Sequence, residues 1–426
     1  MDVNLVKQTN LQTMTGFSAW KEDLDQEGTL KILVCGGGNG AHCMAALASS
    51  RPHVEVRVLT LYADEADRWT KALEEDDMTI SITYSEDHVE DVKSRPSLVT
   101  KDPAKAAEGI HMIFFTVPAF AHAQYLKAIA PHILENTLLI GLPGQAGFEF
   151  QAVKAIGDKA KVCAVASFES LPWACRTMEF GRHVQLLGFK EALGAAILIG
   201  SKSNLTTHSL DVIQFIFGEN PVFKVINNYV AINLMAKSII HPPLMYGRWR
   251  GYNDEVLEAK PLFYQGVDDE QADLLSKVSD EVVKTAKVIQ EKRPTVDMSA
   301  VIHILDWYRE YYCHEITDHG CLKNAMQTNK AYDGLLHPMK EVSDGFVPDF
   351  NYRYIREDVP FGLVVMKGIA QIAEVDTPTI DTIITWAQKK LNKEFLVGKR
   401  LDGKDMEETR APQVYGFKTI EDLFHI

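Results

Sequence analysis

The sequence predicts an α/β protein in which a doubly wound parallel sheet is followed by a mostly α-helical half. Short apolar runs alternate with helical patterns through the first part of the chain, as in proteins that build a parallel sheet. From about residue 213 onward, apolar residues recur at helical spacing instead. With 426 residues the chain is also too long for one ordinary core, so we expect two domains.

The first strand and the turn after it carry the clearest functional signal. An apolar run at 32–35 is followed by Gly36, Gly38 and Ala41 at the spacing G-x-G-x-x-[GA]. Gly36 permits a tight turn, Gly38 lets a pyrophosphate approach the backbone, and Ala41 keeps the next helix close to its strand. The start of that helix favours a phosphate. We therefore predict a Rossmann-type dinucleotide site, the alternative being an ordinary glycine-rich turn. The residues expected there are Gly36, Gly38, Asn39, Gly40 and Ala41.

The second strand should end beside the ribose of the cofactor. Residues 54–61 alternate as a strand does, and an acidic residue about 20 positions past the glycines commonly binds the ribose hydroxyls. We expect Asp64 to do so and Tyr62 to stack on adenine. Arg68, one helical turn further on, would reach the phosphates or simply lie in solvent. No arginine follows the strand immediately, which favours NAD(H) over NADP(H).

Further strands should end at the same edge of the sheet. Apolar runs lie at 110–118, 137–142 and 162–166, with a β-rich excursion near 78–84 and 98–100. Ligands of doubly wound sheets bind outside the carboxyl ends of the strands. We therefore expect Val117, Pro118 and the loop 143–147 beside the cofactor. The loop 167–176 either faces the same site or is structural, with Trp173 packed inward.

The second half is predicted to be helical. Helical patterns cover residues 225–246, 276–291, 298–315, 363–372 and 380–391. We place three regions along the chain. They are an N-terminal extension at 1–29, expected to be flexible with one short helix near 19–24, a dinucleotide-binding domain at 30–225 and a helical catalytic domain at 226–426.

Composition excludes several classes of protein. The net charge of −14 argues against nucleic acid or an anionic membrane as a main partner. No apolar run approaches the ~18 residues of a membrane span, and the acidic first thirty residues resemble neither a signal nor a transit peptide. We expect a cytoplasmic protein. No exposed heptad or repeated apolar patch stands out, so a monomer is expected.

The cysteines do not indicate a metal site. There is no C-x-x-C pair, and the spacing of Cys313, His314, His319 and Cys321 matches no standard zinc pattern. We expect reduced thiols and no metal.

His241 and Asp358 are the candidates for acid–base chemistry. Pro242 and Pro243 are expected to end a long helix at His241, where the dipole favours a protonated imidazole suited to a general acid. The alternative is a histidine that only caps the helix. Asp358 would hold the imidazole in one tautomer if the two met in space, although solvated surface charge is the simpler interpretation from spacing alone. Trp307 lies on a predicted helix with other aromatic residues, as in a pocket wall or, more often, a core.

Motifs in both halves of the chain together resemble the opine dehydrogenases of marine invertebrates. They fall in order along the chain, and the resemblance covers residues 30–420. The motifs lie at 36–42, 141–148, 171–176, 241–242, 247–249, 262–266, 353–354 and 357–360.

This resemblance implies a fold, a reaction and a set of site residues. The family condenses an amino acid with pyruvate and reduces the product with NADH to an N-(1-carboxyethyl) amino acid, which keeps glycolysis running without oxygen. An active-site cleft is expected between the dinucleotide domain and the helical domain. His241 and Asp358 would form the catalytic dyad, with His241 as general acid–base. The resemblance assigns the substrates to Gln145, Ser170, Cys175 and Trp307, and the cofactor phosphates to Arg353.

Lys237 departs from the family, because octopine-forming members carry a tyrosine there. A lysine would repel a guanidinium and attract a carboxylate or sulfonate. We therefore expect taurine, glycine, alanine or β-alanine as the amino acid rather than arginine, unless Lys237 points away from the pocket.

Two other functions stay open. One is another NAD-dependent 2-hydroxyacid or polyol-phosphate dehydrogenase, which would need no amine. The other is a non-catalytic NADH-binding sensor, against which the presence of both His241 and Asp358 argues.

Overall fold

The computed structural model describes residues 11–424, apart from 22–23, 25–27 and 86. Contacts divide the chain into two units. The N-terminal unit comprises the chain up to Gly144 together with Phe148–Tyr229, and the C-terminal unit comprises Gln145–Gly147 and the chain from Val230. The sequence placed its domain boundary at 225.

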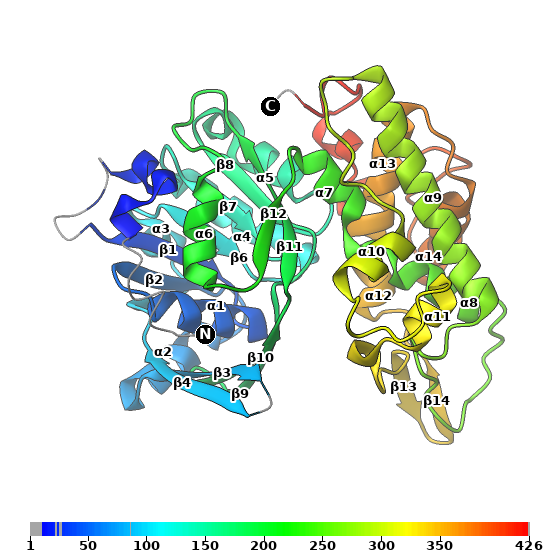
Figure 1. Ribbon diagram of the computed structural model, residues 1–426, viewed down its shortest axis with the longest axis horizontal. Coiled ribbons are helices and arrows are strands. Elements are labelled where there is room, and N and C mark those ends of the chain that lie inside the picture. The colour runs from blue at the N-terminus through cyan, green and yellow to red at the C-terminus, as the bar shows by residue number, and fades with distance from the viewer. Residues whose placement is uncertain (1–10, 22–23, 25–27, 86, 425–426) are drawn as a thin grey trace. The chain divides into compact units, whose positions relative to one another are not determined.

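The N-terminal unit is built on an eight-stranded sheet, in the order β12-β11-β8-β7-β6-β1-β2-β5 (Figure 1). Its strands are β1 (Leu30–Cys35), β2 (Val54–Leu59), β5 (Leu98–Thr100), β6 (Met112–Phe115), β7 (Leu138–Gly141), β8 (Ala164–Phe168), β11 (Ala192–Ile199) and β12 (Val222–Val225). The predicted strands of this sheet are confirmed. The strand order reverses between β1 and β6, and doubly wound sheets bind their ligands at such a point.

One strand pair corrects the expectation of a wholly parallel sheet. β11 runs antiparallel to β8, while the other neighbouring pairs are parallel. After β8 the chain forms two strands of a separate sheet and re-enters as β11. Because no crossover helix returns the chain to the starting edge, β11 enters in the opposite direction.

Helices cover both faces of the large sheet. α1 (Asn39–Ser49) and α6 (Ser209–Phe217) share one core with the side chains of Ile32 and Val34. α4 (Ala119–Ile129) and α5 (Phe148–Ile156) share the other core with Leu33 and Cys35. Since successive side chains of a strand point to opposite faces, the apolar run of β1 serves both cores. α3 (Pro103–Ala107) also packs on the second face.

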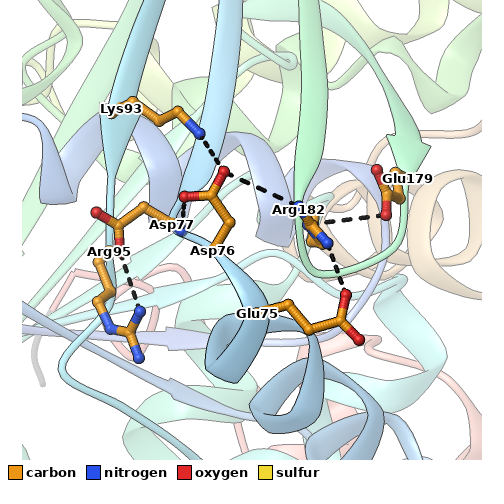
Figure 2. A network of polar contacts seen from close by, with 7 residues as sticks. All are labelled: Glu75, Asp76, Asp77, Lys93, Arg95, Glu179 and Arg182. Atoms are coloured by element: carbon orange, nitrogen blue, oxygen red, sulfur yellow. Dashed lines mark hydrogen bonds and ion pairs between the residues drawn. The ribbon is translucent and has the colours of Figure 1, made fainter.

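A second sheet of four strands lies beside α2 (Glu65–Glu75), in the order β4-β3-β10-β9. Its strands are β3 (Met78–Ser85), β4 (His88–Ser94), β9 (Trp173–Glu179) and β10 (His183–Phe189). Only β3 corresponds to a predicted strand. Figure 2 shows how ion pairs join this sheet to the end of α2: Arg182, in the turn between β9 and β10, reaches Glu75 at 2.7 Å, and Lys93 of β4 reaches Asp76 at 2.7 Å.

Residues 11–20 of the N-terminal segment correct the expectation of a flexible extension, whereas residues 1–10 lie outside the described part of the chain. Residues Thr15–Trp20 form a 3-10 turn, and the side chains of Phe17 and Trp20 are fully buried in the core of the N-terminal unit. The Trp20 indole also donates a hydrogen bond to the carbonyl of Asn136 (2.8 Å). Two buried aromatic side chains bind this segment to the domain. The turn overlaps the predicted range 19–24 only at its first two positions, and residues 22–23 of that range lie outside the described residues.

The C-terminal unit is mostly helical, as predicted. Its helices are α8 (His241–Trp249), α9 (Asp269–Lys292), α10 (Ile304–Tyr311), α11 (Leu322–Gln327), α12 (Arg353–Arg356), α13 (Val364–Ala373) and α14 (Pro378–Lys390), and α7 (Tyr229–Met235) carries the boundary between the units. One hairpin, β13 (Met339–Val342) and β14 (Gly345–Pro348), completes the unit. The long α9 begins with a capping box formed by Asp268 and Gln271.

Short turns connect these elements. A 3-10 turn, η6 (Lys237–Ile239), precedes α8, and a π-helical turn, η8 (Val359–Leu363), precedes α13. Other 3-10 turns lie at Leu11–Thr13, Ala130–His132, Gly157–Val162, Lys330–Tyr332, Met406–Glu408 and Pro412–Tyr415. In the part of the chain described, no helix is both long enough and apolar enough to cross a membrane.

Candidate active site

His241 begins a helix, and the prediction that it ends one is wrong. The predicted helix 225–246 is interrupted because Ala236 has extended backbone angles (φ −55°, ψ 132°), and α8 starts at His241. Pro242 and Pro243 lie in the first turn, where an N–H would have no partner within the helix and its absence costs nothing. The dipole of α8 therefore disfavours a positive charge on His241 instead of favouring it.

A carboxylate compensates for this dipole. His241 Nδ1 lies 2.6 Å from Asp358 Oδ2, although the two residues are 117 positions apart. Asp358 is only 4% exposed. Burial raises the pKa of Asp358, and the hydrogen bond and charge of His241 act in the opposite direction. An imidazole that donates from Nδ1 to this carboxylate exchanges protons with other groups through Nε2.

The second imidazole nitrogen contacts a tyrosine. Tyr264 Oη lies 2.7 Å from His241 Nε2, and burial raises the pKa of Tyr264 well above its ordinary value, so its hydroxyl keeps its proton at neutral pH. The ring of Tyr354 stacks on the imidazole, with centroids 3.7 Å apart and planes 9° from parallel. The imidazole is thus fixed on three sides, while 21% of the His241 side chain stays exposed.

Sequence reasoning gave Tyr264 no role. It lies in the motif 262–266, but no spacing signal joins it to His241, 23 positions away. Only the folded chain brings the two together.

Lys237 and Trp307 form a second cluster. The Lys237 ammonium lies 3.8 Å from the centroid of the Trp307 indole and donates a hydrogen bond to the carbonyl of Met235 (3.0 Å). Trp307 is buried, and the ring of Tyr311 stacks on its indole with centroids 5.3 Å apart. Lys237 is half-buried in η6, four residues before His241, and its ammonium is held by an aromatic face.

The glycine turn has the geometry that a dinucleotide needs. Gly36 has φ +130°, and a Cβ there would lie 2.8 Å from Val117 Cγ1, so only glycine fits. At Gly38, the N-cap of α1, no atom lies within 4 Å of the position that a Cβ would take. The Ala41 methyl group lies 3.5 Å from the Cβ position at Gly36. The turn therefore leaves open space above Gly38 and allows close packing of α1 on β1.

The carboxylate of Glu65 lies against this turn. Glu65 accepts a hydrogen bond from the Thr60 hydroxyl (2.5 Å), and a side chain at Gly37 would collide with its carboxylate. Asp64 instead forms an exposed ion pair with Arg68 (3.0 Å). Both acidic residues stand at the start of α2, and the sequence alone does not tell which of the two turns back toward the glycines.

The other predicted cofactor residues of the N-terminal unit differ in exposure. Tyr62 is 73% exposed, and Arg68 lies over the ring of Phe180, 4.3 Å from its centroid. Pro118 is the exposed N-cap of α4. The Asn39 side chain accepts a hydrogen bond from the N–H of Thr177 (2.9 Å), which joins the start of α1 to β9. Gly40 lies in the first turn of α1.

The predicted substrate residues are divided between the two units. Cys175 is buried in the core of the N-terminal unit, as is Cys43 on α1. Ser170 follows β8 and is half-buried, and Gln145 is half-buried with φ +58°. Arg353, in the C-terminal unit, is half-exposed and pairs with Glu357 (3.1 Å).

No candidate metal centre accompanies these clusters. Over the described residues, no three His, Cys, Asp or Glu side chains are grouped so that they could hold a metal ion. All six cysteines are free.

Comparison with known proteins places the chain in a family. The family model for the α-helical domain of NAD/NADP octopine/nopaline dehydrogenases matches residues 225–391. The chain is 51% identical to an opine dehydrogenase of Haliotis discus hannai, over 93% of this chain and 99% of that protein. It is 46% identical to a tauropine dehydrogenase of Arabella iricolor, over 92% and 99% of the two chains.

A solved structure agrees along nearly the whole chain. Octopine dehydrogenase in complex with NADH and agmatine superposes with a TM-score of 0.89 at 46% identity, over 93% of this chain and 98% of that one. Identity at this level over nearly full length includes both the dinucleotide unit and the helical unit. The chain belongs to the opine dehydrogenases, a family of NAD-dependent oxidoreductases that act on CH–NH donors.

Proposed function

We propose that this chain condenses pyruvate with an amino acid and reduces the product with NADH, giving an N-(1-carboxyethyl) amino acid. The observation that carries the proposal is the buried carboxylate of Asp358 against the partly exposed imidazole of His241. Relatives of known structure support the substrates, since octopine dehydrogenase has been solved with NADH and L-arginine and with NADH and pyruvate.

The dyad suits the proton transfers of this reaction. The amine attacks the keto carbon of pyruvate, the carbonyl oxygen takes a proton, and that oxygen then leaves as water to give an imine. Nε2 of His241 takes the proton that the amine nitrogen loses and passes it to the oxygen, and after reprotonation from solvent it gives a second proton to the hydroxyl, which leaves as water while the nitrogen lone pair forms the protonated imine. Asp358 stabilises the imidazolium against the dipole of α8. Tyr264 holds Nε2 in place between transfers, since a hydroxyl donates to the neutral ring and accepts from the charged one.

The glycine turn fits the cofactor. The open space above Gly38 and the free N–H groups of α1 suit a pyrophosphate, and bound NADH supplies the hydride that reduces the imine. We assign Gly36, Gly38, Asn39, Gly40 and Ala41 to the pyrophosphate, with Val117 and Pro118 beside them. We assign the adenosine end to Glu65, Tyr62, Asp64 and Arg68, and a phosphate contact to Arg353.

We propose that Lys237 determines which amino acid the enzyme condenses with pyruvate. A lysine ammonium held over Trp307 repels a guanidinium and attracts a carboxylate or sulfonate at the far end of a short amine. We therefore propose taurine, β-alanine, glycine or alanine rather than arginine. Gln145, Ser170 and Cys175 are assigned to the substrates by resemblance to the family. We further propose that the enzyme acts as a monomer in the cytoplasm, a reducing compartment in keeping with its free cysteines.

The first experiment measures NADH oxidation with pyruvate in the presence of single amines. We expect oxidation that depends on the amine and is faster with taurine or β-alanine than with arginine. Oxidation with pyruvate alone would indicate an ordinary hydroxyacid dehydrogenase. Binding of NADH without oxidation by any amine would support a sensor.

Substitution of His241 by Gln should lower kcat by a factor of about 10² to 10⁴, because a positioned acid–base is lost. Asp358→Asn should also lower kcat, since an amide does not stabilise the imidazolium. The Kd for NADH, from fluorescence titration, should change little in either variant. His303→Gln is the matched control, because His303 lies in the same unit and its side chain is 22% exposed. Equal kcat losses in His241→Gln and His303→Gln would contradict the assignment.

Glu65→Gln should let the enzyme use NADPH about tenfold better relative to NADH. The carboxylate against the glycine turn repels a 2′-phosphate, whereas an amide still accepts from Thr60 without the charge. The readout is the ratio of kcat/KM for the two cofactors. Asp64→Asn is the control. A larger change of this ratio in Asp64→Asn than in Glu65→Gln would indicate that Asp64 binds the ribose.

Lys237→Met should raise the KM for taurine or β-alanine and lower the KM for arginine, each by about tenfold, because the repelling charge is gone. Lys237→Arg keeps a cation and should retain the original order of substrates. An unchanged order of KM values in Lys237→Met would show that Lys237 does not contact the amino acid.

A further inference from the structure

A buried histidine without a part in the reaction lies at the glycine turn. His42 is the fourth residue of α1 and is fully buried. Its Nδ1 lies 3.0 Å from the carbonyl oxygen of Gly38, and its Nε2 lies 2.8 Å from the N–H of Gly181. Because a backbone N–H only donates, Nε2 is the unprotonated nitrogen. Nδ1 therefore carries the proton and donates it to Gly38.

Burial keeps this ring neutral. It lowers the pKa of His42 to about 4, while the hydrogen bond to Gly38 acts in the opposite direction. Near neutral pH the imidazole therefore has one charge state and one tautomer, and it makes both hydrogen bonds at once.

The bond to Gly38 fixes the peptide that a pyrophosphate would meet. The Gly38 carbonyl accepts a hydrogen bond from the backbone N–H of His42 (3.0 Å) as well as from its imidazole. In a trans peptide the carbonyl and the following N–H point in opposite directions, so the N–H of Asn39 points away from His42. Two donors on one carbonyl thus orient the first N–H group of α1 outward.

Gly181, the hydrogen-bond partner of His42 Nε2, lies in a turn that is itself held in place. Gly181 lies in the turn between β9 and β10, and its φ of +76° suits glycine. The neighbouring Arg182 pairs with Glu75 at the end of α2 (Figure 2). The imidazole also stacks on Trp69 of α2, with centroids 3.8 Å apart and planes 7° from parallel. The β9–β10 turn and α2 therefore form a rigid support for His42.

We propose that His42 is a positioning residue for the cofactor: it holds the Gly38–Asn39 peptide with its N–H toward the pyrophosphate and connects that peptide to the β9–β10 turn. The proposal rests on the dinucleotide role proposed above for the glycine turn. His42 would contact neither substrate nor cofactor, so it should affect the affinity for NADH and not the chemical step.

The test uses His42→Phe in the full-length chain. Phenylalanine keeps a ring against Trp69 and removes both hydrogen bonds. We expect the Kd for NADH, from fluorescence titration, to rise about tenfold, the KM for NADH to rise with it, and kcat at saturating NADH to stay within about twofold. His42→Asn retains a donor near the Nδ1 position and should recover most of the affinity.

A matched control separates positioning from a general loss of stability. Trp20→Phe removes another buried side-chain hydrogen bond to the backbone of the same unit, that to Asn136. It should lower the thermal midpoint without raising the Kd for NADH. Equal rises in Kd for His42→Phe and Trp20→Phe, or an unchanged Kd in His42→Phe, would overturn the proposal for His42 alone. A wild-type chain that does not bind NADH would overturn the dinucleotide assignment as well.

Discussion

The hydrogen bond between Asp358 and His241 organises the C-terminal unit. A carboxylate this deeply buried is costly unless a donor faces it, and the donor comes from the first residue of α8. The bond ties the chain before η8 to the start of α8. It also offsets the dipole of α8, whose N-terminus disfavours an imidazolium. The same contact thus serves the packing of the unit and the proposed acid–base chemistry.

In the N-terminal unit, the glycine turn lets an anion approach the backbone. Glycine at positions 36 and 38 removes side chains from the turn, and His42 holds the Gly38 carbonyl with both its backbone N–H and its imidazole. The ion pairs around Arg182 are individually weak because they are exposed to solvent. They contribute by holding the β9–β10 turn on α2. This turn lies beside the His42 ring, which orients the Gly38–Asn39 peptide.

The proposed selectivity for the amine and for the cofactor depends on single charges held at defined places. Lys237 is held by the face of Trp307 and the carbonyl of Met235, and Glu65 is held by the Thr60 hydroxyl. A charge that is fixed in this way discriminates between ligands better than one on a freely moving side chain, because a competing ligand cannot displace it. Both proposals therefore depend on the neighbours of the charged groups as much as on the charges.

The sequence by itself determined what depends on neighbours along the chain. Apolar runs predicted β1, β2, β6, β7 and β8, the glycine spacing predicted the turn, and helical periodicity predicted most helices of the second half. Tertiary structure decided the rest. Whether Pro242 ends a helix or begins one depends on how the chain before it packs, and Phe17 and Trp20 order the N-terminal segment only because a core exists to receive them. The contacts of His241 with Asp358 and Tyr264, and of His42 with Gly181, join residues 23 to 139 positions apart. Local sequence patterns do not predict such pairs, because the free energy that brings the two residues of a pair together comes from the folding of the whole unit.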